Sequence, residues 1–303
     1  MEIIKSVTKM QKRASDLRQA GYRLGLVPTM GHLHEGHLSL VDIAKDQSDY
    51  AMISIFVNPT QFDEGEDYNE YPRDLDRDID IAKDRGVDLT FVPPVSEMYP
   101  EGYRTYITVE GLSEVLCGAS RPNHFRGVTT VVTKLFNIMH PHLTVFGQKD
   151  AQQAVIIRRL INDLNLEIEL LLGPVIREPD GLAMSSRNTY LSEEERTQAL
   201  CLSTGLRTAK KMVETGETDS NIILEEIRSI IDENPDIRKD YVEAVDLHSL
   251  EPVNSIEQPT LIAVAAYAGT TRLIDNIIVR DYESNDLKIE DTSRDNHRGR
   301  SEL

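Results

Sequence analysis

The sequence predicts an α/β protein with a Rossmann-like, doubly wound parallel sheet, followed by a smaller α+β domain. Short apolar runs alternate with helix-length amphipathic segments through the first half of the 303-residue chain. This alternation is typical of parallel strands joined by helices that cover both faces of the sheet. From Ser192 onwards the order changes to two consecutive helices and then strands. We therefore place the larger domain at residues 1–180 and the smaller one at 181–283.

The elements of the larger domain are predicted from apolar runs and from helical periodicity. Buried strands are expected at residues 23–28, 50–57, 87–92, 143–146 and 166–172. Helices are expected between them, at residues 35–47, 74–85, 124–139 and 151–164. The third of these helices has apolar residues at helical spacing from Val128 to Met139. Because sheets of this kind bind ligands at the carboxyl ends of their strands, the functional site is expected there.

The smaller domain begins with a capped helix. Ser192, followed by Glu195 three positions later, is a capping-box pattern that predicts the start of a long helix. A second helix is expected at 221–233, and strands are expected at 241–245, 261–266 and 272–279. Residues 284–303 are polar and charged, and we expect them to form a disordered tail.

Composition argues against several classes of partner. The net charge of −18 argues against nucleic acid, since phosphate backbones bind to basic surfaces. Cys117 and Cys201 are the only cysteines, and their separation fits a reducing cytosol. The start MEIIKSVTKMQKR lacks the apolar core of a signal peptide, and no apolar run approaches the roughly 18 residues of a membrane helix. We expect a cytoplasmic protein with neither a membrane nor a nucleic-acid partner.

The stretch HLHEGH could hold either a metal ion or phosphate. His34-Glu-Gly-His37 does not have the His-Glu-x-x-His spacing of a zinc protease. A cluster that also included His32 would need further ligands, and no recognisable signature supplies them. The metal hypothesis is therefore the weaker of the two.

The phosphate hypothesis follows from the surrounding elements. A strand ends near Pro28 and a helix begins near Glu35, so free backbone N–H groups point to the edge of the sheet. His34 and His37 are three residues apart and therefore share one side of the first helical turn. The alternative is that these histidines cap the helix and have no further function.

Other polar side chains follow later strands in the same way. Asn58 and Gln61 come after the second strand, where the alternative is an ordinary Asn-Pro turn. Gly147, Lys149 and Asp150 come after a later strand. The glycine permits close approach of a ligand, the lysine can neutralise phosphate, and the aspartate can cap a helix or bind a ribose hydroxyl.

The predicted domain boundary carries the segment DGLAMSSRN. The hydroxyls of Ser185 and Ser186, together with Arg187, form a segment suited to binding an anion, and Gly181 is available as a hinge. A polar linker without function is the alternative.

These motifs resemble those of a known superfamily. HxGH after the first strand and Met-Ser-Ser-Arg after the last resemble the HIGH and KMSKS signatures of nucleotidyltransferases. Over about residues 1–283 the order of motifs is similar to that of the pantoate–β-alanine ligase family (pantothenate synthetases). The motifs are PTMGHLHEGH, FVNPTQF, YPR, HFRGV, FGQKDAQQ, REPDGLAMSSRN and TRLIDN.

The resemblance implies an enzyme that joins pantoate to β-alanine with ATP. In this family the pantoate carboxylate attacks the α-phosphorus of ATP, and pyrophosphate leaves. The amine of β-alanine then attacks the pantoyl adenylate, releasing AMP and pantothenate. The resemblance also implies that Mg²⁺ accompanies ATP and that the protein is a homodimer formed through the larger domain.

The resemblance assigns residues to each part of the reaction. The catalytic residues are His34, His37, Lys149, Ser185, Ser186 and Arg187. The ATP-binding residues are Met30, His37, Gly147, Lys149, Asp150, Ile176, Met184, Ser185, Ser186 and Arg187. The pantoate-binding residues are Pro28, Met30, Gln61 and Gln153. A magnesium ligand is expected at Asp78.

The chain departs from the family pattern at two positions, and two alternatives remain. Asn123 stands where glycine commonly precedes His-Phe-Arg-Gly, and Arg77 stands where the family often has an acid before Asp78. A different nucleotidyltransferase and a non-catalytic nucleotide-binding protein are the alternatives, since fold alone does not fix function. The charge of −18 argues against a tRNA-charging relative, and the intact His34 and Arg187 argue against a protein without catalysis.

Overall fold

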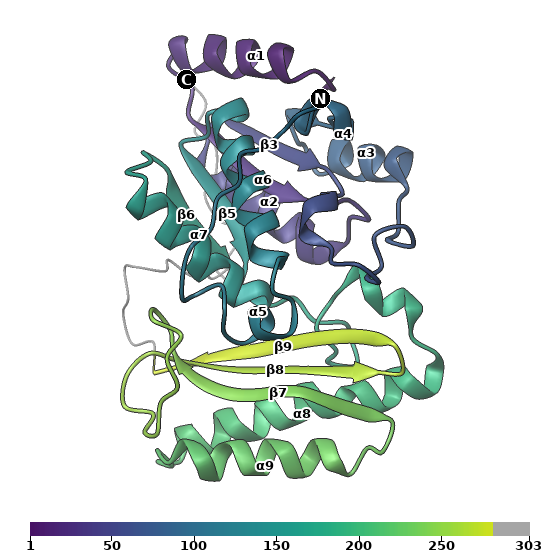
Figure 1. Cartoon of the computed structure of the whole chain (residues 1–303), viewed down its shortest axis with the longest axis vertical. Helices are drawn as coiled ribbons and strands as arrows, with labels where there is room; N and C mark the ends of the chain where they lie inside the picture. The colour runs from purple at the N-terminus through teal and green to yellow at the C-terminus, as the bar shows by residue number, and fades with distance from the viewer. Residues whose placement is uncertain (281–303) are drawn as a thin grey trace, which may run out of the picture.

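The computed structural model describes residues 1–280 and contains a six-stranded parallel sheet beside a three-stranded antiparallel sheet (Figure 1). The spatial order of the larger sheet is β1-β4-β3-β2-β5-β6. Its strands are β1 (Glu2–Ile4), β2 (Leu24–Thr29), β3 (Tyr50–Ile55), β4 (Leu89–Phe91), β5 (Leu143–Gly147) and β6 (Glu169–Gly173). The predicted α/β class is confirmed, while the tail predicted at 284–303 lies outside the described residues.

Helices cover both faces of the larger sheet. Successive residues of a strand point to opposite faces, so each strand contributes apolar side chains to a core on either side. Leu26 and Met52 face one apolar cluster, whereas their neighbours Val27 and Ile53 face another. The first cluster lies under α1 (Val7–Gln19), α6 (His124–Met139) and α7 (Ala151–Asp163), and the second lies under α2 (Glu35–Gln47) and α3 (Leu75–Asp84). Short helices α4 (Val95–Met98) and α5 (Cys117–Ser120) lie in the connection before α6.

Most predicted elements of this unit are confirmed, but its first two were not predicted. The helices expected at 35–47 and 124–139 coincide with α2 and α6. Strand β1 and helix α1 were missed. The first strand is only three residues long, and α1 shows its amphipathic pattern only through Met10, Ala14 and Leu17. These three side chains are fully or almost fully buried.

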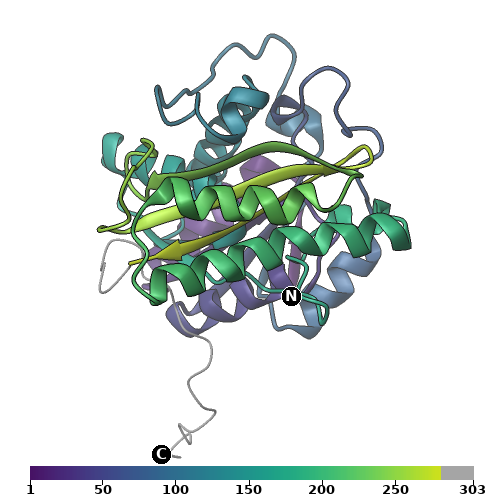
Figure 2. The same cartoon turned by 90° about the horizontal axis from the view of Figure 1, so that it is seen from below.

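The smaller unit is a three-stranded sheet with two helices on its outer face (Figures 1 and 2). It consists of α8 (Glu193–Glu214), α9 (Ser220–Asp232), β7 (Ile237–Asp246), β8 (Thr260–Ala268) and β9 (Thr271–Val279). Ile227 and Val264 belong to the apolar core between the helices and the sheet. On the opposite face, Val245, Leu261 and Ala263 join the cluster of the larger unit. The two sheets are therefore packed through a shared core.

The predicted start of α8 is confirmed. The hydroxyl of Ser192 accepts a hydrogen bond from the backbone N–H of Glu195 at 3.2 Å, and the Glu195 carboxylate accepts the Ser192 N–H at 2.8 Å. The domain division at residue 180 falls in the connection between β6 and α8, and we keep it as a proposal. None of the helices in residues 1–280 is long and apolar enough to cross a membrane.

The order of the strands determines where the larger sheet opens. β2 pairs with β3 on one side and with β5 on the other, so the chain builds the sheet outward in both directions from this point. Such a switch point leaves a crevice outside the carboxyl ends of the two central strands. Here these ends are Thr29 and Gly147.

A glycine in α6 allows a short 3₁₀ helix, η1 (Pro59–Gln61), to pack directly on it. A β-carbon at Gly127 would lie 2.2 Å from the carbonyl oxygen of Thr60 and 2.5 Å from the backbone nitrogen of Gln61. Both neighbours are backbone atoms, which cannot rotate away. The glycine of the HFRGV motif therefore sets the position of Gln61.

The replacement Gly127→Ala is expected to lower the free energy of unfolding by about 1–3 kcal/mol through overpacking. Replacing glycine by alanine within a helix ordinarily raises the free energy of unfolding by roughly 0.5–1 kcal/mol. The change expected for Gly127→Ala therefore has the opposite sign. Urea unfolding of the two proteins measures the difference. A variant at least as stable as the parent would contradict the close packing of η1 on α6.

Candidate active site

A cavity of about 910 Å³ lies at the switch point and is lined by residues of both sheets. Fourteen of the predicted site residues line it, although they come from five separate segments of the chain. They are Pro28, Met30, His34, His37, Gln61, Gly147, Lys149, Asp150, Gln153, Ile176, Met184, Ser185, Ser186 and Arg187. Asp78 is the predicted residue that does not line the cavity. The structure thus brings fourteen of the fifteen predicted residues to one cavity.

His34 and His37 stand at the first turn of α2. His34 is the N-cap residue, and its backbone N–H donates to Nδ1 of His37 at 3.3 Å. The two rings lie 4.0 Å apart between centroids. Because Nδ1 of His37 accepts this bond, the proton of its neutral ring is on Nε2, which makes that nitrogen a hydrogen-bond donor.

Both imidazoles are neutral at physiological pH. Burial, followed by the positive charge of Lys149, lowers the pKa of His34 to about 4. Burial and the neighbouring His34 hold the pKa of His37 well below its usual value. These side chains therefore offer polarised N–H groups to an anion, while full positive charge at the cavity comes from Lys149 and from the arginines that line it, among them Arg187.

The segment around Met184 closes over the N-terminus of α2. The backbone N–H of Gly36 points to the sulfur of Met184 at 3.3 Å, and the hydroxyl of Ser186 donates to the carbonyl of His32 at 3.2 Å. Ser185 caps the short helix η3 (Ser186–Tyr190) by accepting the N–H of Arg187 at 3.3 Å. The MSSR segment is therefore in contact with the HLHEGH segment.

Gln61 is oriented by a buried asparagine. Asn58 is 1% exposed, and its amide nitrogen donates to Oε1 of Gln61 at 3.1 Å. Nε2 of Gln61 is thereby directed to the sulfur of Met30 at 3.0 Å, a weak acceptor that a ligand oxygen could replace. Asn58 was expected at the edge of the sheet, but its function as a support for Gln61 was not predicted.

Two polar residues of β9 attach the smaller unit to the site, and neither was predicted as a site residue. The amide of Asn276 donates to the carbonyl oxygens of Gln148 and Lys149, each at 2.9 Å. Asp275 is 3% exposed and binds both terminal nitrogens of Arg177 at 2.6 and 3.0 Å. The sequence signal for these two residues was that both belong to the TRLIDN motif. Their hydrogen-bond partners could not be predicted from it, because the partners are more than 90 residues away in the sequence.

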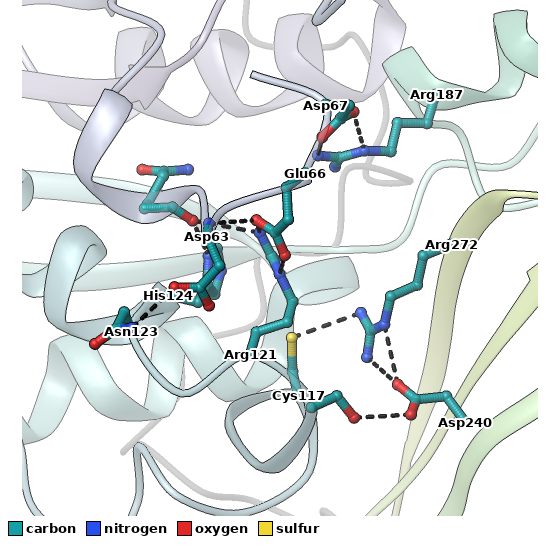
Figure 3. Close-up of polar contacts among 12 residues, drawn as sticks. Asp63, Glu66, Asp67, Cys117, Arg121, Asn123, His124, Arg187, Asp240 and Arg272 are labelled. Carbon is teal, nitrogen blue, oxygen red and sulfur yellow. Dashed lines mark hydrogen bonds and ion pairs between the residues drawn. The ribbon is translucent and has the colours of Figure 1, made fainter. Parts of the chain in front are cut away.

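Arginines around the cavity are paired with acids. Arg187 binds Asp67 through Nε and Nη2 at 2.8 and 2.9 Å (Figure 3). Arg121 binds Glu66, and Arg272 binds Asp240 in the same figure. Asp67 and Glu66 were not predicted as site residues. Their loop shows no pattern that distinguishes it from a solvated acidic turn.

The prediction that Asp78 holds magnesium is not supported, and the residue has a different function. Asp78 is 1% exposed, and its two carboxylate oxygens accept the backbone N–H groups of His32 and Leu33, each at 2.7 Å. Gly31, with φ of +88°, leaves room for this approach, since a β-carbon there would lie 2.8 Å from Asp78. Asp78 anchors the loop before α2. Among residues 1–280 no cluster of three or more histidine, cysteine or acidic side chains could hold a metal ion.

The chain matches the family model described as pantoate-beta-alanine ligase over residues 2–278. It is 53% identical to the pantothenate synthetase of Thermosipho africanus over 279 residues, which is 92% of this chain and 100% of the relative. It is 52% identical to the pantothenate synthetase of Acetivibrio thermocellus over 92% of this chain and 99% of that protein. The predicted resemblance is confirmed.

Solved structures agree in fold. The crystal structure of pantothenate synthetase from Thermus thermophilus has a TM-score of 0.87 at 41% identity, covering 91% of this chain and 99% of that one. A pantoate-beta-alanine ligase from Francisella tularensis, complexed with beta-gamma ATP and beta-alanine, has a TM-score of 0.76 at 33% identity. That match covers 92% of this chain and 97% of the other. The chain therefore belongs to the pantoate–β-alanine ligase family.

Proposed function

We propose that this protein condenses pantoate with β-alanine, using ATP and passing through a pantoyl adenylate. A carboxylate oxygen of pantoate forms a bond to the α-phosphorus while the bond to pyrophosphate breaks. The amine of β-alanine then attacks the acyl carbon, AMP leaves with the carbon–oxygen bonding pair, and the amine loses a proton. The observation that carries the proposal is the convergence of fourteen family-pattern residues on one cavity in a member of the family.

The phosphates of ATP are proposed to lie at the N-terminus of α2. His34 and His37 would donate neutral N–H groups there, and Lys149, Ser185, Ser186 and Arg187 would surround the remaining oxygens. Adenylation needs alignment and charge neutralisation more than covalent help, so this combination of donors suits the step. Gly147, Asp150, Ile176 and Met184 are proposed to hold the adenosine.

Pantoate is proposed to bind between Gln61 and Gln153, against the apolar wall of Pro28 and Met30. The orientation of Gln61 by Asn58 supports this, because it directs an amide N–H toward the cavity. Uncharged amides are suited to the task, since a cation on the carboxylate would stabilise the ground state and weaken the nucleophile.

Magnesium, a homodimer and a cytoplasmic location complete the proposal. Magnesium would enter with ATP and be held mainly by phosphate oxygens, where it would neutralise charge on the leaving pyrophosphate. Asp67 and Glu66, acids of the cavity wall, are already paired with arginines.

The homodimer rests on the family, and the location is supported by the two unpaired, buried cysteines.

The protein is expected to exchange labelled pyrophosphate into ATP when pantoate is present and β-alanine is absent. A free acyl adenylate makes the first half of the reaction reversible without the amine. Replacing ATP by CTP, or leaving out pantoate, should abolish exchange. Exchange that depended on β-alanine would exclude the proposed intermediate.

Replacing His34 or His37 by alanine is expected to lower turnover on the order of 10²–10³-fold, the loss typical of one charge-stabilising donor. Steady-state rates with saturating substrates measure the effect. His248→Ala is the matched control, since this histidine is exposed at the end of β7 and should leave the rate unchanged. Full activity in both site variants would refute their assigned role.

A further inference from the structure

The loop of residues 62–70 is attached to the rest of the cavity by three acids. Each acid contacts a side chain from outside the loop (Figure 3). The contacts are Asp63 with Asn123, Glu66 with Arg121, and Asp67 with Arg187. The last contact differs from the others because Arg187 belongs to the MSSR segment, to which the proposed function assigns phosphate binding.

Arg187 in this structure has the bonding of an arginine whose anion site is already filled. Its Nε and Nη2 atoms form a two-point contact with the carboxylate of Asp67 at 2.8 and 2.9 Å. Its guanidinium carbon lies 5.6 Å from the centre of the Tyr71 ring. Carboxylate and phosphate compete for the same edge of a guanidinium group, because both match its paired donors. A phosphate group must therefore replace Asp67 to bind this edge.

The charges lead to the same conclusion. While Arg187 is paired with Asp67, its positive charge is largely cancelled, and Asp67 itself lines the cavity as an anion. If Arg187 and Asp67 stayed paired, a triphosphate binding beside them would face the negative charge of Asp67. The positive charge of Arg187 would already be largely neutralised. Both side chains retain about a quarter of their exposure, so the pair is not locked by burial and can separate.

We propose that Asp67 is a positioning residue that forms a latch with Arg187 and yields the arginine to ATP phosphate. This inference rests on the proposed function. In the free protein the latch holds Arg187 at the rim and ties the loop to the MSSR segment. Binding of the triphosphate exchanges one anion for another on the same guanidinium edge and removes the Asp67 contact between the loop and the MSSR segment. The hydroxyl of Tyr190 in η3 still donates to the carbonyl of Glu70 in the loop.

The latch predicts that Asp67→Asn binds ATP more tightly than the parent protein. Removing the competing charge should lower the dissociation constant by about three- to fivefold, the range that a partly exposed ion pair supplies. Isothermal titration calorimetry with ATP and Mg²⁺, without pantoate, measures binding in the absence of turnover. Asp67→Glu keeps the carboxylate and should restore the parent value within about twofold. If Asp67 were only an ordinary structural contact, Asp67→Asn would instead bind ATP more weakly than the parent protein.

Asp63→Asn is the matched control, because it makes the same charge change in the same loop at a residue whose partner, Asn123, is uncharged. Its ATP affinity should stay within about twofold of the parent value. In an Arg187→Gln background, Asp67→Asn should lose most of its effect, since the cation for which Asp67 and phosphate compete is then absent.

The possible results separate a failure of the latch from a failure of the proposed function. Unchanged or weaker ATP binding by Asp67→Asn, in a parent protein that binds ATP, would overturn the latch and leave the proposed function standing. Equal tightening by Asp63→Asn, or an undiminished effect in the Arg187→Gln background, would also overturn it. Absence of ATP binding by the parent protein would overturn the proposed function and the latch with it.

Discussion

The carboxylate of Asp78 is the contact on which the geometry of the site depends. The loop between β2 and α2 must turn sharply enough to aim the first turn of α2 at the cavity. Asp78 stabilises that turn by accepting two backbone N–H groups, those of His32 and Leu33, in a buried environment. Losing this acceptor would leave two buried backbone donors unpaired, which is costly. The loop and an acid 45 residues away in the sequence thus function together.

The site separates neutral donors from charged ones. Burial keeps His34 and His37 uncharged, so they can lie next to Lys149 without strong repulsion. The cations are placed around them and, in the case of Arg187, are balanced by an acid. This arrangement fits a ligand whose charge increases on a few phosphate oxygens during the reaction. Preorganised donors reorient little when charge develops, and this is the main source of electrostatic stabilisation in enzymes.

The smaller sheet contributes to the site through β9. Asn276 holds the carbonyl groups of the segment that carries Lys149, and Asp275 holds Arg177 next to the MSSR segment. A change in the position of the smaller sheet would therefore move both cationic parts of the site. The shared apolar cluster of Val245 and Leu261 with the larger unit limits such movement.

The sequence alone determined the fold class, most helices and, through the family motifs, fourteen residues of the cavity wall. The alternation of strands and helices, and polar residues directly after strands, are local patterns, and parallel strands bring their carboxyl ends together by geometry. Local capping signals likewise fixed the start of α8. Only the tertiary structure decided which side chains support the site. Asp78, Asn58 and Asp67 act through partners that folding brings near. The partner of the two acids could not be predicted, because a carboxylate can bind a metal, a backbone N–H or an arginine equally well. Burial made Asp78 a backbone anchor, and proximity made Asp67 the partner of Arg187.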